Sequence, residues 1–146
     1  MMMKKIAACL MAVVMVSSKN IVMYQNGVSE DSNEAEWAEH ISSNIIKLKS
    51  ESVEYILPDG RRVDIFDREN GVAYEVDWCK KYAEGIGQSL GYAIATNCDP
   101  GLILLYKNGE DEYYNTALGI VSQLRERGYK YKLIVLNVQS GKVWKF

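Results

Sequence analysis

The sequence predicts one domain of the α/β class, in its mixed α+β form, with a mixed sheet flanked by helices. Two observations predict this fold. Three strand-like segments follow one another with only short turns between them, which is typical of antiparallel pairing. The later strands are separated by helical segments, which is typical of parallel pairing. The expected order is α-β-β-β-α-β-α-β, and 146 residues are enough for one well-buried core.

The first helix is expected to begin at Ser32 and to end at about Leu48. Serine is a common N-cap residue, and acidic residues such as Glu34 are favourable near the positive end of a helix. Apolar residues then recur at helical spacing, namely Ala35, Trp37, Ala38, Ile41 and Ile45. Residues 19–31 are polar and are expected to form a linker, so the domain is expected to span 32–146.

Three short strands are expected after this helix. The segment SVEYIL at 52–57 alternates between apolar and polar residues, and so do RVDIF at 62–66 and VAYEVDW at 72–78. Alternation with a period of two indicates half-buried strands. The segments PDGR at 58–61 and DRENG at 67–71 hold residue types that favour turns, so the three strands are expected to pair as consecutive hairpins.

The second half of the sequence alternates between helices and strands. KKYAEGIGQSLGYAIAT at 80–96 has helical spacing of its apolar residues, and Pro100-Gly101 is expected to break the chain. LILLY at 102–106 is continuously apolar, which is typical of a strand buried on both faces. A helix is expected over 111–127, ended by Gly128, and a last strand over 132–138.

The N-terminus has the three-part pattern of a secretory signal peptide. MMMKK is followed by the apolar run IAACLMAVVMV and then by small residues, which is the usual layout. The run is too short for a bilayer, which needs ~20 residues. We expect 1–18 to be removed and the mature protein to be exported, periplasmic or secreted, with no membrane attachment. The alternative is a buried first helix or strand in a cytoplasmic protein.

The net charge gives little indication of the partner. The whole chain carries a formal charge of −2, and loss of residues 1–18, with their two lysines, leaves 15 basic against 19 acidic residues. A weakly acidic chain has no strong field to attract nucleic acid. A bound divalent cation would supply positive charge locally, so binding of nucleic acid stays open.

Three carboxylates lie on one predicted hairpin. Glu75 and Asp77 share a face of the strand 72–78, because side chains two apart point the same way. Asp64 falls roughly opposite Glu75 if the hairpin closes through 67–71. Carboxylates this close repel one another unless a positive charge separates them, and a hard cation such as Mg²⁺ accepts oxygen ligands of this kind. The alternative is a solvated hairpin face with scattered acids.

These residues resemble the PD-(D/E)XK nuclease superfamily. Its core is a helix, three strands, a helix and a fourth strand, with an acid on the second strand and acid–any–lysine on the third. Asp64 matches the first acid, and Glu75-Val76-Asp77 matches the second element with its last position changed. EYILPDGRRVDIF, YEVDW and KKYAEGIGQSLGYA are similar to small, often exported, uncharacterised members. The resemblance covers about 36–106 and implies a restriction-endonuclease-like core.

The resemblance implies metal-dependent hydrolysis of phosphodiester bonds. Asp64 and Glu75 would hold Mg²⁺ or Mn²⁺, with the carbonyl of Val76 as a further ligand. The catalytic set would also include the position of the family lysine, where this sequence has Asp77. Lys81 could supply the missing ammonium from the next helix. If it does not, a catalytically inactive module that binds nucleic acid or protein is the alternative.

The resemblance also implies a nucleic-acid substrate, DNA before RNA, and further site residues. Gln88 and Tyr92 form the Q-x-x-x-Y pair that RecB-like members place beside the metal to contact DNA. Members of the superfamily often add an acid from the first helix, and RecB-like members a histidine. Glu36, Glu39 and His40 are the candidates here. The choice between the two glutamates and the oligomeric state both stay open.

GIGQSLG at 85–91 does not indicate a dinucleotide site. Its G-x-G-x-x-x-G spacing lies inside a predicted helix, whereas a Rossmann fingerprint needs a strand-to-helix turn whose N–H groups face the pyrophosphate. Close packing of the helix on the sheet is the expected role of Gly85, Gly87 and Gly91.

Overall fold

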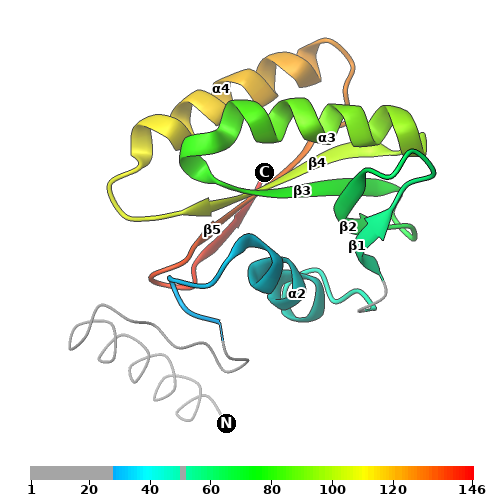
Figure 1. The fold of residues 1–146 in the computed structure, drawn as a ribbon. Helices are drawn as coiled ribbons and strands as arrows, with labels where there is room; N and C mark the ends of the chain where they lie inside the picture. Colours follow the sequence, from blue (N-terminus) through cyan, green and yellow to red (C-terminus); the bar gives the residue numbers. More distant parts are fainter. Residues whose placement is uncertain (1–27, 50–51) are drawn as a thin grey trace, which may run out of the picture.

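The computed structural model describes residues 28–49 and 52–146. It is a mixed α+β fold in which three helices flank a six-stranded mixed sheet (Figure 1). The expected signal peptide at 1–18 lies outside the described residues, as does most of the expected linker at 19–31. In the described part, no helix is both long and apolar enough to cross a membrane.

The sheet has the strand order β1-β2-β3-β4-β5-β6. Its strands are β1 (Val53–Ile56), β2 (Arg62–Asp67), β3 (Val72–Trp78), β4 (Asp99–Tyr106), β5 (Lys132–Asn137) and β6 (Val143–Lys145). β1, β2 and β3 pair as consecutive antiparallel hairpins. β3, β4 and β5 pair in parallel, and β6 returns antiparallel to β5. The predicted change from antiparallel to parallel pairing after the third strand is therefore confirmed.

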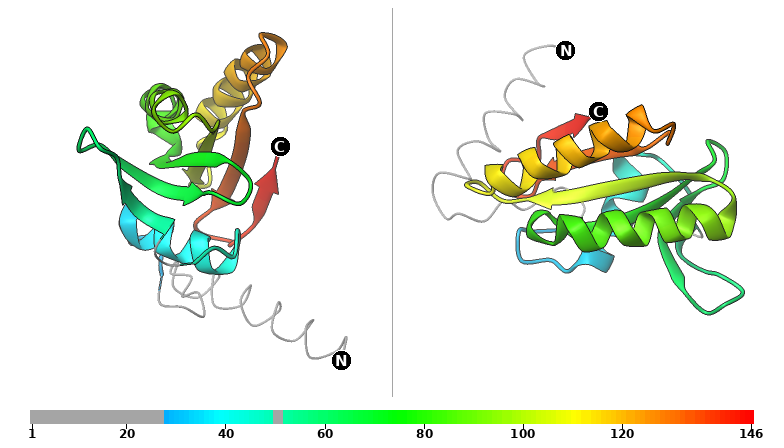
Figure 2. Two further views of the ribbon diagram at one scale, coloured as in Figure 1. Left: turned by 90° about the vertical axis from the view of Figure 1, so that its right-hand side faces the viewer. Right: turned by 90° about the horizontal axis from the view of Figure 1, so that it is seen from above.

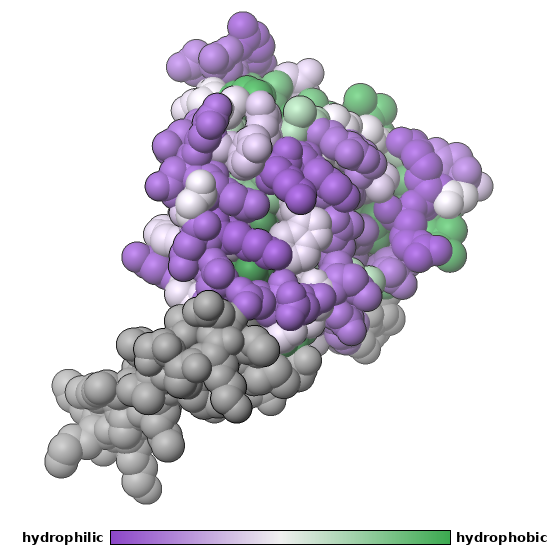
Figure 3. Space-filling view, turned by 60° about the vertical axis from the view of Figure 1, so that its left-hand side comes forward, coloured by the Kyte–Doolittle hydropathy of each residue, from purple (hydrophilic) through white to green (hydrophobic). Residues whose placement is uncertain are grey.

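The helices lie on both faces of the sheet (Figure 2). α2 (Glu34–Asn44) covers one face, and α3 (Tyr82–Thr96) and α4 (Asp111–Glu126) cover the other. A short 3₁₀ turn, η2 (Cys79–Lys81), links β3 to α3. Trp37 and Ile41 of α2 are fully buried in the core of the first face. Figure 3 shows one side of the described surface, on which hydrophilic residues predominate.

The first helix begins and ends differently from the prediction. Asn33, not Ser32, is its N-cap, and its carboxamide and the side chain of Glu36 form a reciprocal capping box, which satisfies two end donors at once. The helix ends at Asn44, because the chain turns there to direct Leu48 N–H to the carbonyl of Ser42. Leu48 still packs against the core, but from a loop.

Pro100-Gly101 does not break the chain; both residues belong to β4. Pro100 pairs with Ala73 of β3, whereas pairing with β5 begins only at Gly101. Pro100 thus lies where β4 has a neighbour on one side only, a position that tolerates the missing N–H. The expected burial of the following apolar run is confirmed, since Leu102 to Leu105 are fully buried.

The strand β6 was not predicted. It is only three residues long, and its segment holds two lysines beside Val143 and Trp144. Such a short segment gives too few alternating positions for a periodic signal. A hairpin turn follows β5, with the Asn137 carboxamide accepting from the N–H groups of Gln139 and Ser140.

Candidate functional site

The hairpin of β2 and β3 brings Asp64 and Glu75 together. Backbone pairing runs from Asp67↔Val72 to Ile65↔Tyr74, and the next step of this register places Asp64 opposite Glu75. The Val76 N–H donates to Asp64 Oδ2 at 2.8 Å. The two carboxylates interact strongly with each other. Asp64 and Glu75 therefore lie close together, as the sequence predicts.

The acids are buried rather than solvated. Glu75 is 7% exposed and Asp77 4% exposed, and both face α3. Gly85 of α3 allows this close approach, since a Cβ there would lie 3.4 Å from the Cβ of Asp77 and 2.8 Å from Leu102 Cδ1. The alternative of a solvated hairpin face does not describe these two side chains.

Burial is the main cause that raises the pKa values of all three carboxyls. The pKa of Glu75 rises to about 9, first through burial and then through the charges of Asp64 and Asp77. The pKa of Asp77 rises to about 7 through burial and the nearby charge of Glu34. Burial also raises the pKa of Asp64. The site therefore holds an excess of negative charge that only protons or a cation can neutralise.

One oxygen of the pair has no partner. Glu75 Oε2 is buried and makes no hydrogen bond to any described residue. A buried acceptor without a partner is costly and calls for a physical explanation. A buried carboxylate oxygen that lacks a donor is suited to a cation.

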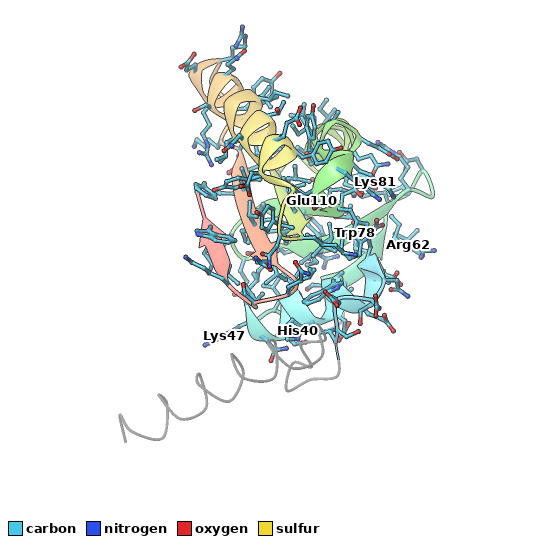
Figure 4. The ribbon with its side chains drawn as sticks, turned by 90° about the vertical axis from the view of Figure 1, so that its left-hand side faces the viewer. His40, Lys47, Arg62, Trp78, Lys81 and Glu110 are labelled. Atoms are coloured by element: carbon cyan, nitrogen blue, oxygen red, sulfur yellow. The ribbon has the colours of Figure 1, made fainter. Side chains whose placement is uncertain are left out.

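Lys81 reaches the edge of this acidic group. Its Nζ lies 3.9 Å from Asp77 Oδ1 and 3.4 Å from Glu34 Oε1. Lys81 is exposed and the nearby acids raise its pKa, so its ammonium is charged at neutral pH. Figure 4 shows Lys81 where β3 passes into α3, beside Trp78.

The first helix contributes an acid other than the predicted ones. Glu34, on its first turn, acts electrostatically on Asp64 and Asp77. Glu36 caps the helix instead. Glu39 and His40 line, with Glu36, a separate groove along α2, and Figure 4 shows His40 well apart from Lys81. The periodicity could have indicated Glu34, since it precedes buried Trp37 and Ala38 by one helical turn.

The Q-x-x-x-Y pair divides in the structure. Tyr92 lies beside the acids, where its hydroxyl interacts with the Glu75 carboxylate. Burial and then the charges of Glu75 and Asp64 raise the pKa of Tyr92. Gln88 is exposed and donates to Glu84 Oε1 at 3.5 Å. Of these two residues, Tyr92 is the one that contacts the acidic group. Gln88 lies one helical turn before Tyr92, on the exposed side of α3.

The predicted packing role of the three glycines of α3 holds for one of them. Gly85 packs closely against the sheet, as described above. A Cβ at Gly87 would meet nothing within 4 Å, and one at Gly91 would meet only Arg61 Nη1, at 3.3 Å. Gly87 is therefore exposed, and Gly91 accommodates a side chain from another segment.

Asp64 and Glu75 are the residues of the described part that fit a metal ion in the way the sequence predicts. No group of three or more His, Cys, Asp or Glu side chains in that part of the chain has an arrangement that could hold a metal ion. Asp64 and Glu75 are two carboxylates, and Mg²⁺ is commonly held by one or two carboxylates together with water and substrate phosphate. The pair and its unpartnered oxygen fit that coordination.

The pH dependence of stability should reveal the raised pKa values in the metal-free protein. Because their pKa values are raised, the carboxyls of Asp64, Glu75 and Asp77 keep their protons in the folded state at pH values where the unfolded chain has lost them. The free energy of unfolding should therefore fall as pH rises from about 5 to 9, by up to about 1.4 kcal/mol per pH unit for each such proton. Thermal unfolding in EDTA across this range measures it, and a melting temperature that rises with pH would contradict the assignment.

No family model matches the sequence, and no curated protein or solved structure matches it either.

Proposed function

We propose that this protein is a metal-dependent nuclease that hydrolyses phosphodiester bonds, with a restriction-endonuclease-like core. The observation that carries the proposal is the close pair of half-buried Asp64 and buried Glu75, in which Glu75 Oε2 lacks a partner among the described residues. The resemblance of Asp64 and Glu75-Val76-Asp77 to the PD-(D/E)XK pattern supports it. So does the observed order of one helix, three strands, a helix and a fourth strand.

Asp64 and Glu75 would hold Mg²⁺ or Mn²⁺, with the carbonyl of Val76 as a further ligand. When bound, such an ion polarises a phosphate oxygen and lowers the pKa of the attacking water. Without the ion, burial raises the pKa of Glu75 to about 9, so binding of the ion would displace a proton from that carboxyl. The burial of Glu75 also keeps bulk water away from its oxygens.

Lys81 would provide the ammonium that the family motif has at the position of Asp77. It lies 3.9 Å from Asp77 Oδ1, so the acid holds it at the edge of the acidic group. From there it can stabilise negative charge that develops on a phosphate. Tyr92 would orient Glu75 through its hydroxyl, and Gln88 would contact the substrate backbone on the outer side of α3.

The test is cleavage of single- and double-stranded DNA and of RNA by the full chain, with Mg²⁺, Mn²⁺ or EDTA. We expect cleavage that needs metal and that falls by at least about 100-fold in Asp64→Ala and Glu75→Ala, since each removes a ligand. Glu69→Ala is the matched control, because Glu69 is an exposed acid at the turn of the same hairpin. Cleavage that persists in EDTA or in both ligand variants would refute the proposal.

A second candidate function is a nuclease-fold module that binds nucleic acid or protein without turnover. Asp77 at the position of the family lysine favours it. The ion pairs of Lys81 with Glu34 and Asp77 also favour it, because an ammonium group that is already paired with two acids is less available to a phosphate. Metal-dependent binding of DNA with no cleavage under any condition would favour this function over the first.

A further inference from the structure

The side chain of Arg61 lies against α3, although the residue belongs to the turn between β1 and β2. Its Nη1 atom is 3.3 Å from the place that a Cβ would take at Gly91. That distance is shorter than an ordinary van der Waals contact, so a Cβ at position 91 would require the guanidinium group to shift by a few tenths of an ångström. The glycine therefore leaves the space that Arg61 fills.

This placement brings a positive charge next to the acidic site. The charge of Arg61 acts on the Tyr92 hydroxyl, and that hydroxyl interacts with Glu75 and with the charge of Asp64. Tyr92 thus interacts with Arg61 at the surface and with Glu75 and Asp64 at the acidic site. Three separate segments of the chain contribute to these interactions.

Arg61 is held by a single exposed acid. Its Nε and Nη2 atoms both contact Asp59 Oδ2, at 2.8 and 2.7 Å, and its backbone N–H donates to Asp59 Oδ1 at 3.0 Å. The two side chains are 48% and 50% exposed, and exposed pairs of this kind contribute at most about 1 kcal/mol. A stronger anion can therefore replace Asp59.

We propose that Arg61 binds a backbone phosphate of the nucleic acid, beside the phosphate that Asp64 and Glu75 act upon, and exchanges Asp59 for it. This inference rests on the proposed function and deepens it. The planar guanidinium matches the geometry of a phosphate and binds it through two parallel hydrogen bonds. In the free protein Asp59 keeps the guanidinium turned toward α3 and ready for that contact.

The neighbouring Arg62 provides the matched control. It carries the same charge and is also exposed, but it forms a 3.5 Å ion pair with Glu54 on β1. Figure 4 shows Arg62 extending outward from the end of the sheet that holds β1 and β2. Loss of Arg62 removes the same charge from the surface without removing the contact with α3.

The experiment measures equilibrium binding of labelled DNA duplexes to the full chain with Ca²⁺, a hard cation that takes the same oxygen ligands. Arg61→Ala should weaken binding about 10-fold and reduce the dependence of log K on log salt by about one. Arg62→Ala should change both much less. Arg61→Lys should restore the salt dependence but only part of the affinity, because lysine lacks the two-donor geometry.

Two further measurements separate a phosphate contact from a structural role. Gly91→Ala changes no charge and favours the helix by up to about 1 kcal/mol. It shifts the guanidinium group by only a few tenths of an ångström, so it should weaken binding much less than Arg61→Ala, which removes the group. Duplexes with one neutral methylphosphonate at successive positions should include one position that weakens binding to the parent but not to Arg61→Ala. That position would identify the contacted phosphate.

Each outcome decides the inference. Equal effects of Arg61→Ala and Arg62→Ala, with binding by the parent intact, would overturn the role of Arg61 and leave the proposed nuclease function standing. If the parent neither binds nor cleaves nucleic acid with any divalent ion, both proposals fail.

Discussion

Glu75→Gln is expected to abolish cleavage and yet to stabilise the metal-free protein. Glutamine has the shape of glutamate, so the packing against α3 is preserved, but it carries no charge that must be neutralised. At pH 8 the carboxyl of Glu75, with its pKa at about 9, is protonated in the folded state and ionised in the unfolded chain. That difference lowers the free energy of unfolding of the parent.

We therefore expect Glu75→Gln to raise the free energy of unfolding in EDTA at pH 8 by ~2 kcal/mol. The gain should shrink as pH falls, and it should vanish below about pH 4, where the unfolded chain also keeps the proton. Added Mg²⁺ should raise the melting temperature of the parent by mass action and leave that of the variant unchanged. Cleavage should fall at least about 100-fold with loss of the ligand.

Glu69→Gln makes the same chemical change at an exposed position of the same hairpin. It should leave stability, the response to Mg²⁺ and cleavage close to those of the parent. A Glu75→Gln variant that is less stable than the parent in EDTA at pH 8 would show that the carboxyl stabilises the fold. The assignment of Glu75 to a ligand site would then lose its physical basis.

Gly101→Ala is expected to cause the largest loss of stability of any single methyl group added to this sheet. Gly101 lies opposite Tyr74 in the parallel pair of β3 and β4, and the ring of Tyr74 lies across it. A Cβ there would be 2.4 Å from Tyr74 Cδ1 and 2.8 Å from Val72 Cγ1. Both neighbours are buried in the core beneath α2, so neither can move freely.

We expect a loss of about 3 kcal/mol in the free energy of unfolding, the upper part of the range for overpacked cores. Denaturant unfolding in EDTA measures it. Gly119→Ala in α4 is the matched control, because a Cβ there meets nothing within 4 Å. That variant should gain up to about 1 kcal/mol through helix propensity. Equal stability of the two variants would show that Tyr74 can repack around the added methyl.

The two variants Glu75→Gln and Gly101→Ala affect opposite faces of the sheet. Gly101 contacts the α2 side of β3, whereas Glu75 faces α3. Gly101→Ala should therefore lower stability without changing how the protein that remains folded responds to Mg²⁺. A loss of that response as well would indicate that the position of the hairpin acids depends on the packing of Tyr74.

The sequence by itself determined the order of the elements and the pairing of the first hairpins. Alternation along 62–66 and 72–78, with a short turn between them, decides which side chains share a face. For that reason the sequence alone predicts that Asp64 lies near Glu75. The apolar run at 102–106 likewise indicated a strand covered on both faces. These features are local, because backbone geometry imposes periods of two and 3.6 on neighbouring residues.

Only the tertiary structure decided which distant residues complete the site. Glu34 approaches the hairpin, while Glu36, Glu39 and His40 do not, because the angle at which α2 crosses the sheet selects one face of its first turn. Arg61 packs closely against α3 at Gly91, where a Cβ would lie 3.3 Å from its Nη1. Close approaches of this kind depend on the absence of a side chain at one point, and no periodic pattern records them.

The same reason explains β4 and the burial of the acids. Pro100 and Gly101, considered alone, indicate a break in the strand. In the structure both belong to β4, because the ring of Tyr74 needs the space above Gly101 and Pro100 has no strand to pair with on its β5 side. The hairpin could show that the carboxylates are adjacent. Their raised pKa values arise only when α3 packs closely enough, at Gly85, to exclude water from them.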